Sequence, residues 1–337
     1  MLRRTWSFRR PTSASRHLTS RSATALSCVL SLTAGLGSST VQTYPSLFAA
    51  TRSKRTSFAL SVSKARKRSW DGLVPWRWYL SIMEVLVAQG LARPEVGFGL
   101  QQAVLEEVAA NARGPTTLLW TSSRYVGATH PETRLAGFDE AARLAEEAGF
   151  PVLIRNSGGG AVAANEGSIS FSLTLPVEDL RHGLYERYTE GADLIVAALG
   201  KLGVEAEAGE VEGEFCPGAY SVRTGGYSGT KVAGLAQRVT RRAARMEALV
   251  LVTKTAELRG VLERFYGALG LPFRAGSVAD LCSASVPEAI EAFAEALRES
   301  YGAREVKLDE EILLRAHALR ERWRARPTPP ETLSSSL

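Results

Sequence analysis

The sequence predicts an α+β fold in which a largely antiparallel β-sheet is flanked by helices. Stretches with strand character follow one another along the chain and are mostly joined by short turns, which favours antiparallel pairing. A few segments with helical periodicity accompany them, and we expect these helices to cover one side of the sheet. Apolar residues make up 45% of the chain and charged residues 23%, which is typical of a soluble globular protein.

The first 75 residues form a basic extension that we expect to be disordered. Residues 1–70 contain thirteen Lys or Arg and no acidic residue, whereas the rest of the chain has seven more acidic than basic residues. The formal net charge of +6 therefore comes from the extension and does not indicate nucleic-acid binding by the folded part. The mildly apolar stretch at residues 23–37 is too short to span a membrane.

Two explanations of this extension remain open. Its Arg-, Ser- and Thr-rich composition without acidic residues is typical of a transit peptide, which would imply import into an organelle. Alternatively, translation began upstream of the working start, which would then be Met83. A bacterial protein of this kind would be cytoplasmic. Neither explanation assigns chemistry to residues 1–75.

The folded domain is expected to cover residues 83–326. Residues 83–89 are rich in Val and Leu and predict a strand. Residues 97–113 place apolar side chains on one face at helical spacing, which predicts a helix. Residues 116–129 are rich in Thr and aromatic residues and predict one long strand or two short ones.

The next elements continue the mixture of helix and strand. Residues 137–150 predict a helix that has acidic residues near its start and ends at Gly149. Residues 151–156 predict a strand that runs into a glycine-rich loop, and residues 168–176 alternate like a half-buried strand. A long helix follows, and one of its faces carries Leu180, Leu184, Tyr188, Ile195 and Leu199.

The last part of the domain predicts a hairpin and further helices. Residues 230–239 and 245–254 predict two strand arms around a turn at 240–244. The Pro- and Ser-rich end, residues 327–337, is expected to be a flexible tail. Helical periodicity predicts the remaining helices at 255–269, 286–301 and 308–325.

The three cysteines, Cys28, Cys216 and Cys282, suit neither a disulfide framework nor a CxxC metal site, so we expect a reducing compartment. Cys282 has no charged neighbour in the sequence and predicts a small packed residue. Cys216 lies in Phe-Cys-Pro-Gly, a turn that would hold its side chain at the end of a strand. Two interpretations of Cys216 stay open: a packed core residue, or a nucleophile with Lys231 as its electrostatic partner.

A glycine-rich stretch, Arg-Asn-Ser-Gly-Gly-Gly-Ala-Val, occupies residues 155–162 directly after a predicted strand. Consecutive glycines let main-chain amides approach an acyl or phosphate oxygen without interference from Cβ atoms. The stretch matches neither the Walker signature nor the GxGxxG fingerprint of dinucleotide sites. A tight turn remains the alternative interpretation of the glycines, and a solvated strand end that of Arg155.

These motifs, in this order, resemble the lipoate-protein ligase and octanoyltransferase family. The likeness rests on the glycine-rich stretch with the strand after it, on Cys-Pro-Gly-Ala-Tyr at 216–220, on Gly-Thr-Lys-Val-Ala-Gly-Leu-Ala-Gln-Arg at 229–238 and on the C-terminal helices. It covers most of 83–325 and implies the biotin/lipoate ligase type of catalytic fold. Within the family, the chain is most similar to amidotransferases of lipoate assembly. Such enzymes move an octanoyl group from octanoylated glycine cleavage H protein to the lysine of lipoyl domains.

The resemblance implies roles for individual residues. In such amidotransferases the cysteine becomes acylated, the lysine contacts the acyl carbonyl, and the glycine loop lines an acyl tunnel. Here the catalytic residues would be Cys216 and Lys231, and residues 233–236 are expected to form part of the tunnel wall. The implied substrate-binding set is Arg155, Ser157, Gly158, Gly159, Gly160, Gly218, Gly234 and Ala236.

Three function classes stay open: octanoyl transfer through Cys216, ATP-dependent lipoate ligation, and carrier binding without catalysis. ATP-using relatives tend to have a His-Asp pair after the glycine loop, where this chain has Ala164 and Asn165, and this difference favours transfer. Transfer begins and ends with an amide and therefore needs no nucleotide, so neither a cofactor nor a metal is expected. The donor is either octanoylated H protein, which the Cys-Pro-Gly turn favours, or octanoyl-acyl carrier protein.

The expected partners are the glycine cleavage H protein as octanoylated donor and the lipoyl domains of 2-oxoacid dehydrogenase complexes as acceptors. Neither nucleic acid nor a membrane is expected. Arginines on and around the predicted hairpin tip suggest a landing patch for acidic carriers, with a solvated hairpin end as the alternative. These residues are Arg238, Arg241, Arg242 and Arg245.

Overall fold

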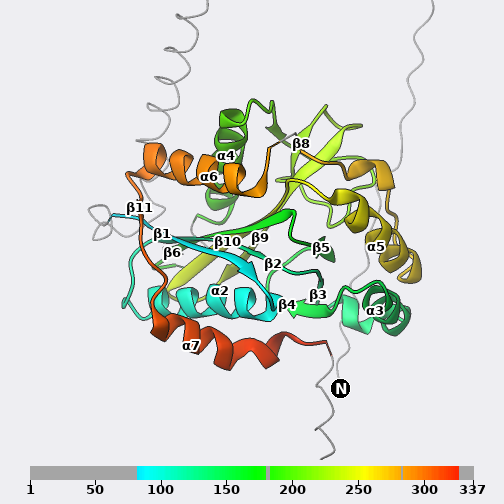
Figure 1. Ribbon diagram of the computed structural model, residues 1–337, viewed down its shortest axis with the longest axis horizontal. Helices are drawn as coiled ribbons and strands as arrows, with labels where there is room; N and C mark the ends of the chain where they lie inside the picture. The colour runs from blue at the N-terminus through cyan, green and yellow to red at the C-terminus, as the bar shows by residue number, and fades with distance from the viewer. Residues whose placement is uncertain (1–81, 180–182, 282–283, 326–337) are drawn as a thin grey trace, which may run out of the picture. The chain divides into compact units, whose positions relative to one another are not determined.

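The computed structural model describes residues 82–179, 183–281 and 284–325. Within these residues an eight-stranded sheet has the order β11-β1-β2-β6-β10-β9-β8-β7 (Figure 1). Its strands, in chain order, are β1 (Glu84–Leu91), β2 (Thr116–Ser122), β6 (Ser168–Pro176), β7 (Glu207–Ala208), β8 (Val222–Thr224), β9 (Thr230–Val239), β10 (Ala243–Leu251) and β11 (Arg304–Glu305). Strands β2 and β11 run parallel to β1, and the other neighbouring strands are antiparallel. The predicted, largely antiparallel sheet is confirmed.

A smaller sheet has the order β4-β3-β5 and consists of β3 (Tyr125–Thr129), β4 (Val152–Arg155) and β5 (Val162–Ala164). Strand β3 runs parallel to β4 and antiparallel to β5. The stretch 116–129 therefore forms two strands that belong to two different sheets. The glycine-rich stretch connects β4 to β5, so the small sheet holds both ends of that loop.

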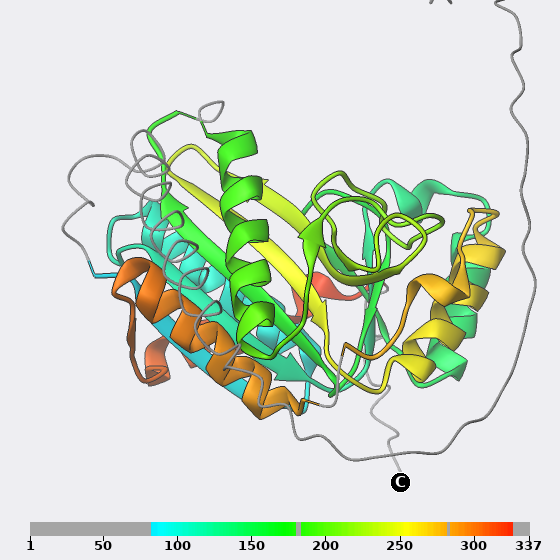
Figure 2. The same ribbon diagram turned by 90° about the horizontal axis from the view of Figure 1, so that it is seen from above.

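Helices cover both faces of the eight-stranded sheet, so the expectation of one covered side is wrong. On one face lies α2 (Pro94–Ala109) with α7 (Glu310–Leu319) behind it, and on the other lie α4 (Leu184–Lys201) and α6 (Val286–Tyr301) (Figures 1 and 2). The reason is visible in β6, which is buried along its whole length instead of half-buried. Its large apolar residues pack toward α4 and α6, whereas the alternating Ser and Thr residues fit closely beneath α2.

The close approach of α2 depends on two glycines. A Cβ atom on Gly97 would lie 2.3 Å from the Trp120 ring, and one on Gly99 would lie 2.3 Å from the carbonyl oxygen of Ala316. The helix begins three residues earlier than predicted, at Pro94, because proline suits the first helical turn, where its missing N–H has no partner to lose. These contacts fix α2 against β2 and α7.

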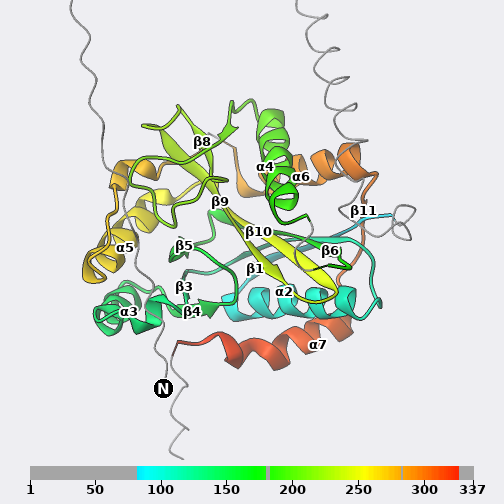
Figure 3. The same cartoon turned by 180° about the vertical axis from the view of Figure 1, so that it is seen from behind.

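Two further helices accompany the small sheet. Helices α3 (Phe138–Glu147) and α5 (Thr255–Ala268) pack against each other beside β3, β4 and β5 (Figure 3). Short 3₁₀ turns η2 (Glu132–Arg134), η3 (Ala275–Ser277) and η4 (Arg320–Trp323) complete the described elements. The predicted hairpin is confirmed as β9 and β10, joined by residues 240–242.

The predicted helix at 286–301 is confirmed at both ends because its sequence carries explicit stop signals. Ser285 and Glu288 form a capping box at the N-terminus of α6. Gly302 follows its last residue in the left-handed conformation, which ends the helix.

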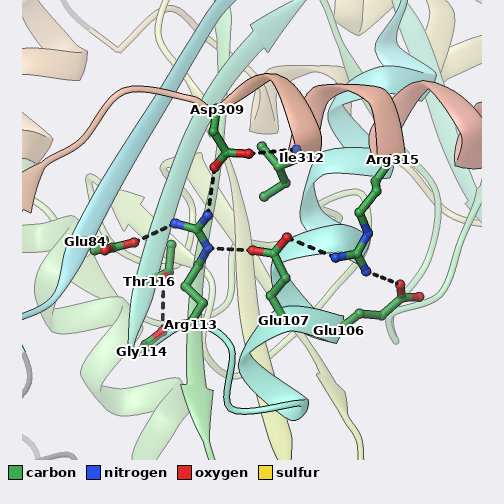
Figure 4. Close-up of polar contacts among 9 residues, drawn as sticks. All are labelled: Glu84, Glu106, Glu107, Arg113, Gly114, Thr116, Asp309, Ile312 and Arg315. Atoms are coloured by element: carbon green, nitrogen blue, oxygen red, sulfur yellow. Dashed lines mark hydrogen bonds and ion pairs between the residues drawn. The ribbon is translucent and has the colours of Figure 1, made fainter.

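An ionic cluster fastens α7 to α2 and to the start of β1 (Figure 4). Arg113, in the turn before β2, pairs with Glu84 at 2.6 Å, with Glu107 at 2.7 Å and with Asp309 at 3.0 Å. Asp309 also caps α7 by accepting a hydrogen bond from the amide of Ile312. Burial disfavours the charge on Arg113, but its hydrogen bonds to Glu107 and Glu84 outweigh this and raise its pKa. One guanidinium thus joins segments that are far apart in the sequence.

Several expectations lie outside the described residues: the basic extension at 1–75, the first turn of the long helix at Leu180, the packing of Cys282 and the tail at 327–337. Among the helices of the part that the structure describes, none is long and apolar enough to cross a membrane.

Candidate active site

Cys216 lies in the loop that connects β7 to β8, and only 7% of its surface is exposed. Its φ is +44°, which places a non-glycine residue in the left-handed region. Such a conformation costs on the order of 1–3 kcal/mol and is concentrated at functional sites. Burial by itself would suit a packed core residue, so the contacts of the sulfur must distinguish the two interpretations.

Two donors face the Cys216 sulfur. The amide of Gly160 lies 3.2 Å from Sγ, and Nη2 of Arg155 lies 3.6 Å from it. Gly159 has φ of +95°, and a Cβ atom there would lie 2.5 Å from Sγ. The glycine-rich loop therefore closes directly over the thiol. A guanidinium and a main-chain amide are thus both placed to donate to the sulfur.

Arg155 is fixed by partners on both sides of its guanidinium. Nη1 donates to the hydroxyl of Ser157 at 2.8 Å, and Nη2 donates to the carbonyl oxygen of Gly160 at 2.7 Å. The Ser157 hydroxyl in turn donates to Glu247, whose carboxylate lies 3.6 Å from Nη1 of Arg155. Glu247 also accepts from Nε of Arg245 at 2.9 Å. This network orients Arg155 toward the sulfur from the end of β4.

Lys231 lies beneath the loop that carries Cys216, and its side chain is completely buried. Its Nζ donates to the carbonyl oxygens of Phe215 at 2.9 Å and Cys216 at 2.8 Å, and lies 3.6 Å from the Glu214 carboxylate. Burial lowers the pKa of Lys231, while the charges of Cys216 and Glu214 act against this shift. A Cβ atom at Gly234 would lie 2.9 Å from Cε of Lys231, so the glycine makes room for this side chain.

Glu214 organises the turn that follows Cys216. Its Oε1 accepts from the amide of Gly218 at 3.0 Å and from the hydroxyl of Ser221 at 2.8 Å. Gly218 therefore contributes an amide to this turn, and a Cβ atom there would meet nothing within 4 Å. Together with Lys231, Glu214 holds the Cys-Pro-Gly segment from both sides of the cysteine.

A pocket that opens to solvent lies beside Cys216 and Arg155. Its apolar wall comes from α2 and several strands and includes Phe98, Trp120, Val162, Leu235 and Leu249. Of the expected wall at 233–236, Gly234, Leu235 and Ala236 line the cavity, whereas Ala233 packs in the core on the opposite face. An apolar space that opens onto a thiol suits an acyl chain attached to that thiol.

The expected substrate-binding set divides into three positions. Arg155, Gly234 and Ala236 line the cavity. Ser157, Gly159 and Gly160 do not line the cavity. They bind Arg155 or approach the cysteine sulfur. A Cβ atom on Gly158 would meet nothing within 4 Å, as at Gly218.

The expected arginine patch is wrong in one member. Arg238, Arg241 and Arg242 are exposed around the β9–β10 turn, but Arg245 is buried. The alternation of β10 turns Arg245 and Glu247 to the same face, where they form an ion pair at 2.9 Å beneath α2. The sequence predicted a longer hairpin turn than the structure has, so Arg245 was expected near the tip. It lies within β10 instead.

Sequence reasoning missed Glu247, Tyr125 and Tyr266 among the polar residues around the site. Burial raises the pKa of Tyr125 to about 12, and its hydroxyl shares a hydrogen bond with Ser170. The signal for Glu247 was present, since a lone acid stands within the apolar run of β10. Within the described residues, no group of His, Cys, Asp and Glu side chains could hold a metal ion.

Comparisons with known proteins agree on one family. A family model described as the lipoyl protein ligase A/B catalytic domain matches residues 93–299. Two curated relatives are named octanoyl-[GcvH]:protein N-octanoyltransferase. The one from Geobacillus kaustophilus is 30% identical over 173 residues, and the one from Bacillus velezensis is 31% identical over 177 residues. Each match covers 51% of this chain, and the matches span 60% and 59% of the relatives' own lengths.

Among solved structures, lipoate-protein ligase A bound with ATP is similar to this chain with a TM-score of 0.59 and 20% sequence identity. The similarity covers 72% of this chain and 95% of that one. At this identity the likeness shows the fold alone, and it confirms the fold that the sequence motifs implied.

Proposed function

The chain belongs to the lipoyl protein ligase A/B catalytic domain family, and from this premise we propose that it is an acyltransferase that moves octanoyl groups between carrier proteins through Cys216. The donor is octanoylated glycine cleavage H protein, and the acceptor is the lysine of a lipoyl domain of a 2-oxoacid dehydrogenase complex. The names of the two curated relatives support the octanoyl group and the H protein. The observation that carries the proposal is the Cys216 thiol held between the Gly160 amide and Arg155 beside an apolar cavity.

The reaction has two balanced halves. In the first, the Cys216 thiolate attacks the carbonyl carbon of the octanoyl-lysine amide, a C–S bond forms, the C–N bond breaks, and the leaving lysine nitrogen takes up a proton from solvent. In the second, the neutral amine of the acceptor lysine attacks the thioester, the C–S bond breaks, and the amine loses a proton as the thiolate returns. One amide is broken and one is formed, so no nucleotide is consumed.

The charges around Cys216 support the first half. The thiolate is the attacking form of a cysteine, and hydrogen-bond donors and positive charge near a sulfur stabilise that form. Arg155 and the Gly160 amide supply such donors, and Lys231 adds a positive charge behind the cysteine main chain. Attack also creates an oxyanion, and removal of one well-placed donor to an oxyanion typically costs about 3–4 kcal/mol.

The apolar lining of the cavity supports an acyl group as the transferred group. Burial of about six methylenes at ~0.8 kcal/mol each contributes on the order of 5 kcal/mol, enough to favour an eight-carbon chain over a short one. Phe98, Trp120 and Leu249 supply the apolar surface at this cavity. Gly234 and Ala236 add small residues to the β9 wall beside Leu235.

An ATP-dependent ligase is the alternative with the same fold. At the position where such relatives tend to carry His-Asp, Asn165 is buried, accepts from the amide of Gly167 at 3.0 Å and donates to the carbonyl of Lys254 at 3.0 Å. These bonds commit Asn165 to the turn between β5 and β6. This arrangement favours transfer over ligation.

The test supplies three octanoyl sources in parallel: octanoyl-H protein, octanoyl-acyl carrier protein, and free octanoate with ATP. The measured quantity is the mass of an unmodified lipoyl domain before and after incubation with the full chain. We expect octanoylation with octanoyl-H protein in the absence of ATP. Modification only with octanoate and ATP would assign the ligase activity, and modification only from the acyl carrier protein would replace the proposed donor.

A further inference from the structure

Tyr266 of α5 connects the cysteine segment to the glycine-rich loop through its hydroxyl. The hydroxyl accepts a hydrogen bond from the amide of Cys216 at 2.8 Å and donates one to the carbonyl oxygen of Ala161 at 2.9 Å. The residue is 3% exposed, and its ring packs at a tilt against that of Phe273. One buried group therefore binds both of the segments that meet at the sulfur.

We propose that Tyr266 is a positioning residue for Cys216, which fixes the left-handed cysteine and the glycine-rich loop as one unit so that the Gly160 amide stays on Sγ. The φ of +44° at Cys216 is strained and persists only where neighbouring contacts determine it. Lys231 holds the carbonyl side of this residue, and Tyr266 holds its amide side.

The loop side of this arrangement has a second anchor. The amide of Ala161 donates to Oε1 of Glu132 at 2.7 Å, and the other carboxylate oxygen of Glu132 accepts from the amide and the hydroxyl of Thr129 at 2.9 Å each. Ala161 is therefore held at its amide by Glu132 and at its carbonyl by Tyr266. Because Gly160 immediately precedes it, these two bonds determine where the Gly160 amide points.

The hydroxyl is suited to a fixed role and not to proton transfer. Burial is the largest cause of the raised pKa of Tyr266, and the charge of Cys216 adds to it. The phenol thus stays protonated throughout the working pH range and keeps its donor bond to Ala161. A Cβ atom at Gly160 would lie 3.2 Å from this oxygen, so the loop approaches the phenol closely.

The proposal rests on the proposed function only in giving Cys216 a reaction to perform, so its test uses the thiol alone. In the full chain, Tyr266→Phe keeps the ring and removes both hydrogen bonds. The measured quantity is the rate of Cys216 alkylation by iodoacetamide from pH 6 to 10, read by peptide mass. We expect the midpoint of this profile to move up by about one pH unit, because the released loop no longer holds the Gly160 amide on Sγ, a hydrogen bond worth about as much.

Tyr301→Phe is the matched control, since its hydroxyl also donates a hydrogen bond, here to the carboxylate of Glu190, in the packing of α6 on α4. We expect its alkylation profile to match that of the unchanged protein. A folded Tyr266→Phe protein with an unchanged midpoint would overturn the proposal. A shifted midpoint in a protein that transfers no octanoyl group would keep the positioning role and remove the proposed function.

A measurement on the unchanged protein covers the case in which Tyr266→Phe does not fold. Hydrogen exchange of the Cys216 amide should be slowed at least about a hundredfold relative to an open loop, because its proton is bonded to a buried hydroxyl. Exchange at the rate of an unprotected amide would contradict the proposal.

Discussion

Lys231 donates a hydrogen bond to the carbonyl oxygen of Cys216, with 2.8 Å between Nζ and the oxygen. A second bond of the same ammonium goes to the carbonyl oxygen of Phe215 at 2.9 Å. Among the residues that the structure describes, the cation at the sulfur is instead Arg155, whose Nη2 lies 3.6 Å from Sγ. The structure therefore separates two tasks: Lys231 holds the main chain of the nucleophile, and Arg155 approaches its sulfur.

Lys231→Met should fold but lose transfer activity by about a hundredfold, since it removes the charge and both main-chain bonds behind Cys216. Lys231→Arg should restore little, because a planar guanidinium does not reproduce a compact ammonium. The measurement is the initial rate of lipoyl-domain octanoylation. Lys254→Met, at a surface lysine whose side chain is 56% exposed, is the matched control and should leave this rate unchanged. Equal rates in the two Met variants would remove Lys231 from the mechanism.

The buried ammonium also predicts a pH dependence. Burial lowers the pKa of Lys231 below the ordinary 10.5, so it loses its charge as the pH rises through that lower value. We expect the rate of Cys216 acylation to fall on the alkaline side before pH 10.5. The profile of Lys231→Met should lack this fall. A rate in the unchanged protein that still rises at pH 10.5 would show that the charge is not used.

Gly159→Ala should slow acylation of Cys216 by at least about tenfold, because a methyl group would lie 2.5 Å from Sγ at a φ of +95°. Gly158→Ala offers a matched comparison one residue away, where a methyl group meets nothing within 4 Å. We expect a clearly smaller loss there. Acyl-enzyme formation under single-turnover conditions measures both, and equal losses would contradict the close approach of the loop to the sulfur.

Arg113→Met should lower the free energy of unfolding by about 2 kcal/mol, since it leaves the partly buried Glu84 without its cation and leaves Glu107 with Arg315 alone. Arg143→Met is the control, because Arg143 pairs with two carboxylates on an exposed helix face, and it should cost less than about 1 kcal/mol. Urea unfolding measures both. Equal losses would show that the cluster does not stabilise the docking of α7.

A chain that begins at Met83 should keep its transfer rate and melting temperature. Every described contact of the site is made by residues beyond this position. The carbonyl oxygen of Met83 accepts a hydrogen bond from the amide of Arg304 at the sheet edge. Comparison of the two chains in the same assay and by calorimetry tests this. A large loss in either quantity would assign a structural role to residues 1–82.

The order and type of most elements could be predicted because each has a local signal. Ser285 with Glu288 fixes the start of α6, and Gly302 fixes its end. The placement of β6 could not be predicted in the same way, because Ser170 and Ser172 resemble a solvated face until α2 covers them. Local periodicity reports a strand but not what lies above it.

The candidate site shows the same limit. The motifs identified Cys216, Lys231 and the glycine-rich loop, since each has a distinctive local sequence. Tyr266 and Glu247 have none, because a tyrosine on a helix reaches the Cys216 amide, and an acid on a strand reaches Arg155, only through the fold. The contact of Arg155 with the sulfur likewise depends on a strand end and a distant loop meeting in space.

The central claim is the covalent intermediate on Cys216, and intact mass analysis tests it most directly. The full chain is incubated with octanoyl-H protein without ATP, then treated with hydroxylamine or with an unmodified lipoyl domain. We predict one octanoyl group on Cys216 that hydroxylamine removes, that the lipoyl domain accepts on its lysine, and that is absent from Cys216→Ala. An unchanged enzyme mass, or an adduct undiminished in Cys216→Ala, would contradict the account.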